Sequence, residues 1–219
     1  MEQRLSPNCE PRPEGMPVDM LVIHYTGMRS AEEALQRMCD PAAKVSAHYC
    51  IDENGTITRL VAEDMRAWHA GVSSWRGHDD VNSRSIGIEL VNPGHEFGYR
   101  EFPEVQVTTL ILLASAILRR HAIPARNVVG HSDVAPSRKQ DPGELFPWLR
   151  LARAGIGLWP EPRPAEAEDI PAMLGNYGYR SAEQGALAAF QRHFRPSRID
   201  GVPDEESAEL LAGLLAIAD

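Results

Sequence analysis

The chain has 219 residues and a net charge of −9 at pH 7, and 43% of its residues are hydrophobic. Because no basic run offsets the acidic balance, a phosphate backbone is excluded as the expected partner, and we expect no nucleic acid. The hydrophobic share is ordinary for a soluble protein with a core. No apolar run approaches the ~20 residues of a membrane-spanning helix.

Cysteine usage and the N-terminus bear on the compartment. The three cysteines, Cys9, Cys39 and Cys50, are odd in number and do not form the pattern of a disulfide framework. Residues 1–9 contain no apolar segment typical of a secretory signal, and Cys9 lacks the context of a lipid-anchored cysteine. We therefore expect a cytoplasmic protein, with the periplasm as the alternative, and we expect a monomer.

The first half of the chain predicts a strand, a helix and a hairpin. Ser30 is a suitable N-cap for the helix, and Asn54-Gly55 is the strongest short signal for a hairpin turn. In chain order, the expected elements are an irregular, Pro- and Glu-rich segment over 1–17, a strand over 19–24, a helix over 31–39 and hairpin strands over 47–51 and 56–60.

The second half predicts a buried strand, a long helix and a helical C-terminal region. Apolar residues recur at helical spacing between Pro103 and Pro124. In chain order, the expected elements are a strand over 86–91, a helix over 105–121, a strand ending at 128–129, a helix over 145–154, a proline-rich linker over 158–168 and three short helices over 169–219.

Two histidines and an aspartate stand where strands are expected to end. His24 closes an apolar run, His131 follows Val128-Val129-Gly130, and Asp141 lies in the irregular segment beyond it. Imidazole and carboxylate are zinc ligands, and three protein ligands with one open position are typical of a catalytic zinc site. We predict Zn²⁺ on His24, His131 and Asp141. His48, on the hairpin, is expected to be a buried structural histidine.

Two further charged residues complete the predicted centre. Glu89 is a single carboxylate inside an otherwise apolar strand, which is costly unless the group is paired or needed, so it is a candidate general base. Lys139 stands two positions before Asp141 and would place a positive charge beside the metal. Taken alone, the segment around His131 could equally be an ordinary loop with solvated side chains.

Five segments in chain order resemble the type 2 zinc-dependent N-acetylmuramoyl-L-alanine amidases, a family related to the peptidoglycan-recognition proteins and the phage lysozyme-amidases. The resemblance covers roughly residues 17–150. The segments are Val22-Ile23-His24-Tyr25-Thr26-Gly27, Ser46-Ala47-His48-Tyr49, Ala67-Trp68-His69-Ala70-Gly71, Ser85-Ile86-Gly87-Ile88-Glu89 and Gly130-His131-Ser132-Asp133-Val134-Ala135-Pro136-Ser137-Arg138-Lys139-Gln140-Asp141-Pro142-Gly143.

The resemblance implies an α/β fold with a central mixed sheet flanked by helices. It also implies hydrolysis of the amide between N-acetylmuramic acid and L-alanine of the stem peptide, with Glu89 as base and Lys139 stabilising the oxyanion. Muropeptides are the expected partners. The residues expected to contact substrate are Tyr25, Trp68, His69, Asn82, Arg84 and Arg138.

The C-terminal region resembles the small three-helix peptidoglycan-binding module of wall hydrolases, in Ala188-Ala189-Phe190-Gln191-Arg192-His193-Phe194 and Asp200-Gly201. A plain packing domain is the alternative. We expect a catalytic domain over 1–157, a linker over 158–168 and this module over 169–219. The 1,6-anhydro substrate of cell-wall recycling is favoured, and a wall-active periplasmic amidase, a non-catalytic muropeptide-binding protein and a partner-binding role of the C-terminal helices are the alternatives.

Overall fold

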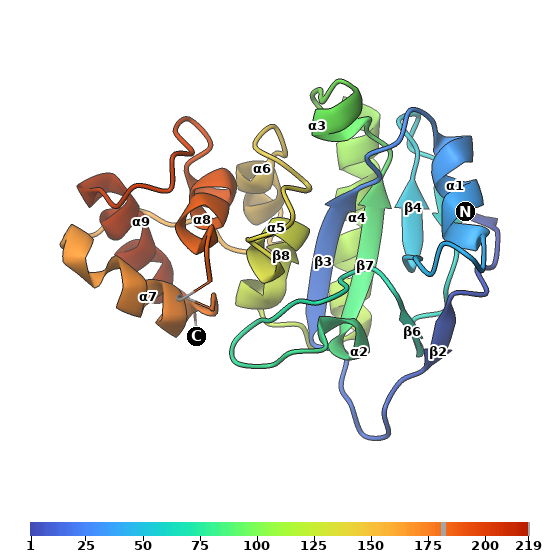
Figure 1. Ribbon diagram of the computed structural model, residues 1–219, viewed down its shortest axis with the longest axis horizontal. Helices are drawn as coiled ribbons and strands as arrows, with labels where there is room; N and C mark the ends of the chain where they lie inside the picture. Colours follow the sequence, from blue (N-terminus) through green and yellow to red (C-terminus); the bar gives the residue numbers. More distant parts are fainter. Residues whose placement is uncertain (181–182, 219) are drawn as a thin grey trace.

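The computed structural model describes residues 1–180 and 183–218. Within them, six strands form one sheet in the order β1-β5-β4-β7-β3-β8. Strand β2 pairs with β6 separately (Figure 1). The strands are β1 (Glu2–Gln3), β2 (Cys9–Pro11), β3 (Met20–Tyr25), β4 (Tyr49–Ile51), β5 (Ile57–Arg59), β6 (Met65–Ala67), β7 (Ser85–Leu90) and β8 (Val128–Gly130). The helices are α1 (Ala31–Cys39), α2 (Val81–Arg84), α3 (Gly94–Phe97), α4 (Glu104–Arg120), α5 (His131–Val134), α6 (Trp148–Arg153), α7 (Ile170–Tyr177), α8 (Ala186–Phe194) and α9 (Glu205–Leu215), with 3₁₀ turns η1 (Ala125–Asn127) and η2 (Ala167–Asp169).

The sheet is mixed, as predicted. Strand β3 lies between β7 and β8 and is parallel to both, β4 is parallel to β7, and β5 is antiparallel to β4. In this register His24 lies opposite Glu89 on β7, and Ile23 lies opposite Gly130 on β8. Parallel pairing therefore brings the carboxyl ends of β3, β7 and β8 to one edge of the sheet.

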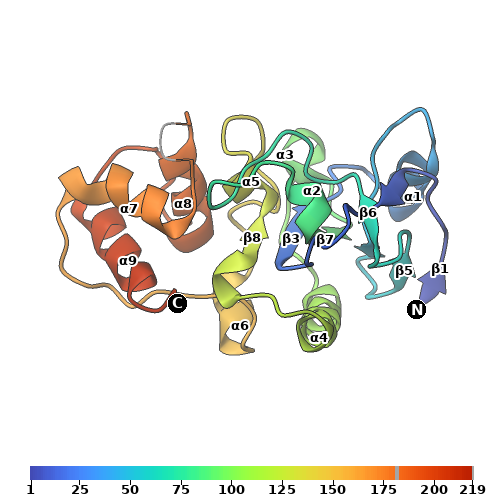
Figure 2. The ribbon, with the colours of Figure 1, turned by 90° about the horizontal axis from the view of Figure 1, so that it is seen from below.

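Alternation along β3 separates two hydrophobic layers. Leu21 and Ile23 pack with the buried face of α4, which covers one side of the sheet (Figure 2). Met20 and Val22 point to the opposite side, where they belong to a hydrophobic cluster that continues through Val129 into the C-terminal helices. Because side chains alternate along a strand, His24 shares the side of Met20 and Val22.

The C-terminal helices α7, α8 and α9 pack on one another and on the main body. Their core includes Phe190 and Leu211 and continues into Trp75 and Val129. The proline-rich segment before them runs along α9, where Arg163 donates its N–H to the carbonyl of Glu209 (3.0 Å). The three predicted helices are present; the division at 158–168 stays a prediction, and residues 181, 182 and 219 of the module lie outside the described residues.

The first helix and the hairpin form where the sequence predicts them. Ser30 accepts the N–H of Glu33 (3.2 Å) as the N-cap of α1, and β4 and β5 pair across the Asn54-Gly55 turn. No helix in the part of the chain that the structure describes is both long enough and apolar enough to cross a membrane.

The expectation for residues 1–17 was wrong, because this segment contains β1 and β2. The strands pair with β5 and β6, which lie far along the chain. The side chain of Asn8 donates to the carbonyls of Met38, Asp40 and Val45 at the end of α1. These partners are distant in sequence, so a local reading does not reveal them.

Candidate metal centre and active site

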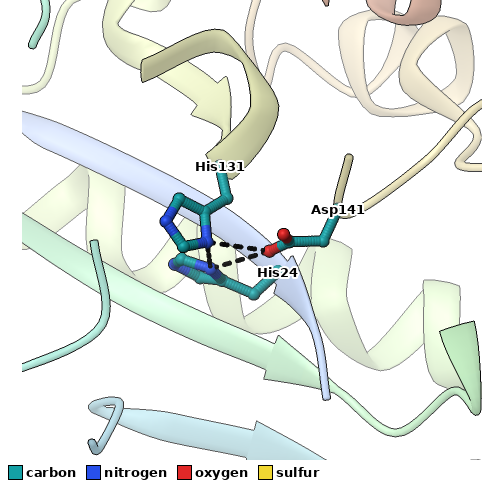
Figure 3. Close-up of side chains that lie close together, drawn as sticks. All are labelled: His24, His131 and Asp141. Atoms are coloured by element: carbon teal, nitrogen blue, oxygen red, sulfur yellow. Dashed lines mark hydrogen bonds and ion pairs between the residues drawn. The ribbon is translucent and has the colours of Figure 1, made fainter. Parts of the chain in front are cut away.

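Three of the predicted site residues meet at the carboxyl edge of the sheet. His24 lies near the end of β3, His131 is the first residue of α5 directly after β8, and Asp141 lies on the loop beyond (Figure 3). His24 Nδ1, His131 Nδ1 and Asp141 Oδ2 are each 3.0 Å from the other two. All three side chains are buried.

The donor set fits a zinc ion. Two imidazole nitrogens and one carboxylate oxygen converge on a single point, as the ligands of a catalytic zinc site do. Burial, and then the nearby His131, lower the pKa of His24 to about 4, so this imidazole is neutral and available as a ligand near neutral pH. Burial would raise the pKa of Asp141, but His131 and His24 outweigh it and hold that pKa below its usual range.

Both histidines are held through their second ring nitrogen. His24 Nε2 lies 3.0 Å from Nδ1 of His69, and His69 Nε2 lies 3.1 Å from the hydroxyl of Ser85. His131 Nε2 donates to the carbonyl of Ala70 (3.1 Å). Such contacts fix the orientation of a ligating ring and leave its other nitrogen for the metal.

Gly87 makes room for His69 behind the site. A Cβ at Gly87 would lie 2.5 Å from Cγ of His69, so only glycine fits beneath this ring. A glycine inside a strand often marks such a close approach. Because Gly87 has no side chain, the ring of His69 can lie against β7 behind His24.

Glu89 is a half-buried carboxylate on β7 with one oxygen, Oε2, buried and without a hydrogen-bond partner in the described chain. Burial and the charge of Asp141 raise the pKa of Glu89 well above its usual value, and Lys139 offsets part of this. The side chain also lines a cavity of about 60 Å³ beside α1, which has room for water. A carboxyl group with a raised pKa beside a cavity that can hold water suits proton transfer near neutral pH.

Lys139 supplies positive charge to the same place. It is half-buried, and its charge lowers the pKa of both Glu89 and His24. A cation there can stabilise negative charge that develops on a reacting carbonyl oxygen.

The family described as N-acetylmuramoyl-L-alanine amidase matches residues 14–144. The chain belongs to this amidase family. It is 37% identical over 230 residues to the N-acetylmuramoyl-L-alanine amidase AmiD of Escherichia coli, covering 90% of this chain and 82% of AmiD. It is 34% identical over 163 residues to the 1,6-anhydro-N-acetylmuramyl-L-alanine amidase AmpD of Haemophilus influenzae, covering 66% of this chain and 86% of AmpD.

Solved structures agree with the sequence relatives. The E. coli AmiD complex with anhydro-N-acetylmuramic acid-L-Ala-D-γ-Glu-L-Lys has a TM-score of 0.82 at 36% identity, covering 94% of this chain and 92% of that one. AmpDh3 of Pseudomonas aeruginosa, in complex with an anhydromuramic pentapeptide, has a TM-score of 0.81 at 36% identity, and the match covers 92% of both chains. The predicted family, fold and amidase activity are thereby confirmed.

Two residues predicted to contact substrate are internal in this amidase. His69 is 5% exposed and contacts His24 and Ser85 instead of lining an open groove. Asn82 is also 5% exposed, and its Oδ1 accepts the backbone N–H groups of His69 and Ala70. Asn82 thus holds the turn that carries His69.

Three others are half-buried with partners inside the chain. The hydroxyl of Tyr25 lies 2.9 Å from Nδ1 of His95, the Trp68 ring nitrogen donates to Glu10 (3.2 Å), and Arg84 pairs with Asp19. Tyr25 adjoins His24 in the chain, and a substrate role for these three residues stays a prediction.

Arg138 is exposed and braces the loop beside His131. Its guanidinium donates to the carbonyls of Ala70 (2.6 Å) and Val72 (2.9 Å). Ala70 is also the acceptor for His131, so Arg138 helps to fix that carbonyl. A substrate role for Arg138 stays a prediction.

Ser85 and Asp133 were not among the residues predicted to form the site. Ser85 accepts from His69, and Asp133 is a buried carboxylate two positions after His131. Both lie inside the motifs quoted above, but their partners are set by the tertiary fold. Buried polar side chains near predicted ligands are the signal that could have singled them out.

Proposed function

We propose that this amidase uses zinc on His24, His131 and Asp141 to cleave 1,6-anhydro-N-acetylmuramyl peptides between the lactyl carbonyl and L-alanine. The observation that carries the proposal is the triangle of ligand atoms, each 3.0 Å from the others. Glu89 lies opposite His24 on the next strand, with Oε2 buried and unpartnered in the described chain. The AmiD and AmpDh3 complexes with anhydromuropeptides support the substrate class.

The residues divide the reaction between them. His24, His131 and Asp141 would hold a zinc ion, which would act as a Lewis acid and lower the pKa of water so that a nucleophile is available near neutral pH. Glu89 accepts the proton of the attacking water and delivers it to the nitrogen of the departing L-alanine. Lys139 stabilises the negative charge on the former carbonyl oxygen of the tetrahedral intermediate.

The protein's own framework keeps these groups in place. His69 and the carbonyl of Ala70 orient the two imidazoles, which lets the ligands hold one geometry through the reaction. The sheet supplies the rest, because His24 and Glu89 stand on adjacent paired strands.

The zinc-loaded protein tests the proposal on two matched substrates, a 1,6-anhydro-muramyl tripeptide and intact insoluble peptidoglycan. Cleavage of the soluble fragment alone supports the proposed recycling role. Release of stem peptides from both supports the wall-active alternative. Cleavage of neither would overturn the proposal. The cytoplasmic location stays a prediction.

A further inference from the structure

A buried carboxylate outside the ligand set joins the metal centre to the C-terminal helices. Asp133, in α5, is 2% exposed and accepts three hydrogen bonds, each 2.7 Å long. Oδ2 accepts the backbone N–H of Gly130 and Nδ1–H of His193, and Oδ1 accepts the hydroxyl of Tyr179. A carboxylate at this depth is stable only while such donors remain.

The first of these bonds holds the turn that presents His131. Gly130 is the N-cap of α5, and His131 is the first residue of that helix. A Cβ at Gly130 would lie 2.7 Å from Cδ of Pro142 and 3.4 Å from Oδ2 of Asp133. Gly130 is therefore packed between the Asp133 carboxylate and Pro142, the residue after Asp141.

The other two donors come from the C-terminal region. His193 lies in α8, and Tyr179 follows α7; α8 stands beside α5 in both views (Figures 1 and 2). The His193 ring stacks on Trp148 at 3.7 Å between centroids, and Trp148 lies close to Gly130. The ring of Tyr179 packs edge-on against Trp75 at 5.1 Å. Both donors are held rigidly by aromatic contacts.

We infer that Tyr179 and His193 are positioning residues of the metal centre, acting through Asp133 on the first turn of α5 and so on His131. The C-terminal helices then form part of the catalytic architecture, whatever else they bind. The inference rests on the proposed zinc site.

The test uses the full chain and the variants Tyr179→Phe and His193→Phe, which keep the aromatic packing and remove one donor each. Tyr177→Phe is the matched control, because Tyr177 is equally buried, packs on the same Trp75 and is not one of the three donors. The measurements are the zinc dissociation constant, by competition with a chelator, and the thermal midpoint of the metal-free protein.

We expect Tyr179→Phe and His193→Phe each to weaken zinc binding about 10-fold, the lower end of what loss of an outer partner costs, and Tyr177→Phe less than about two-fold. Unchanged zinc affinity in both variants, even with a lower thermal midpoint, would mean that Tyr179 and His193 have a structural role only. That result would overturn this inference and leave the proposed function standing. Tyr179→Phe decides if His193→Phe does not fold. A parent protein that binds no zinc would overturn the proposed function, and this inference with it.

Discussion

His69 stands directly behind His24, with its Nδ1 3.0 Å from Nε2 of His24 and the two rings edge to face. With a metal on Nδ1 of His24, Nε2–H of His24 donates to Nδ1 of His69. Nε2–H of His69 then donates to Ser85, whose hydroxyl donates to the carbonyl of Val81 (2.6 Å). Burial and the neighbouring His24 hold the pKa of His69 well below its usual value, so this ring is neutral, as the chain of donors requires.

His69→Phe keeps a ring over Gly87 but removes the acceptor for His24. We expect zinc affinity to fall about 10- to 100-fold, the usual effect of losing a hydrogen-bond partner of a metal ligand. Chelator competition with the purified variant measures it. His48→Phe is the control: His48 is equally deep and packs on His69 but makes no bond to His24. Parent-like affinity in His69→Phe would refute the orienting role.

Gly87→Ala tests the same contact from the strand. Its Cβ would meet the His69 ring at 2.5 Å, so we expect about 1–3 kcal/mol of destabilisation from overpacking, with weaker zinc binding because the ring is displaced. Gly55→Ala is the matched control. Its Cβ would meet the side chains of Thr109 and Val105 in α4 at 2.9 Å, away from the ligands and from the C-terminal helices. Chemical denaturation and zinc titration separate the two variants: both lose stability, and only Gly87→Ala loses metal affinity.

Local patterns were enough to predict the central strands of the sheet and the side chains that gather at its edge, His24, His131 and Asp141. His24 and His131 each stand at the end of an apolar run, and Glu89 interrupts the apolar pattern of a third strand. Parallel pairing of these strands brings the three positions together. The direction in which His69 points was not predictable from its own segment, which had indicated a place in the substrate groove. Gly87 carried the missing signal, because a glycine inside an apolar strand marks a close neighbour.

Contacts between segments far apart in the chain could not be predicted from local sequence patterns. The three donors to Asp133 include Tyr179 and His193, which stand 46 and 60 positions away. Nothing in the motif around Asp133 points to them. The same holds for the strand β1, whose pairing with β5 is fixed only once the hairpin exists.

Asp141→Ala removes one corner of the ligand triangle. We expect zinc content well below one per chain after dialysis, because two imidazoles alone hold the ion weakly, and activity falls with it. Elemental analysis measures the content. Asp19→Ala, which breaks an ion pair with Arg84 away from the triangle, serves as control and should keep full occupancy. Full zinc occupancy in Asp141→Ala would count against its role as a ligand.

Glu89→Gln should separate metal binding from catalysis. The amide cannot accept the proton of the attacking water, so we expect kcat/KM to fall about 10²- to 10⁴-fold, the usual contribution of a positioned acid or base. Zinc content should match the parent, because Glu89 is not one of the three ligands. Turnover of the anhydro-muramyl tripeptide and elemental analysis check both parts. Near-parental turnover would contradict the assignment of Glu89 as the general base.

Glu89→Gln should also change the pH dependence of stability in the metal-free protein. Burial and Asp141 raise the pKa of Glu89 in the folded state above its ordinary value of 4.5. The unfolded chain therefore loses this proton first, and the parent loses stability as pH rises from 4.5 toward the folded-state pKa.

Glutamine has no such proton, so the variant should be more stable than the parent at pH 7, and the gain should vanish below about pH 4.5. Thermal midpoints of both proteins from pH 4 to 8, with a chelator present, measure the difference. A pH-independent difference between them would mean that Glu89 ionises normally, and the raised pKa that suits it to proton transfer would have to be abandoned.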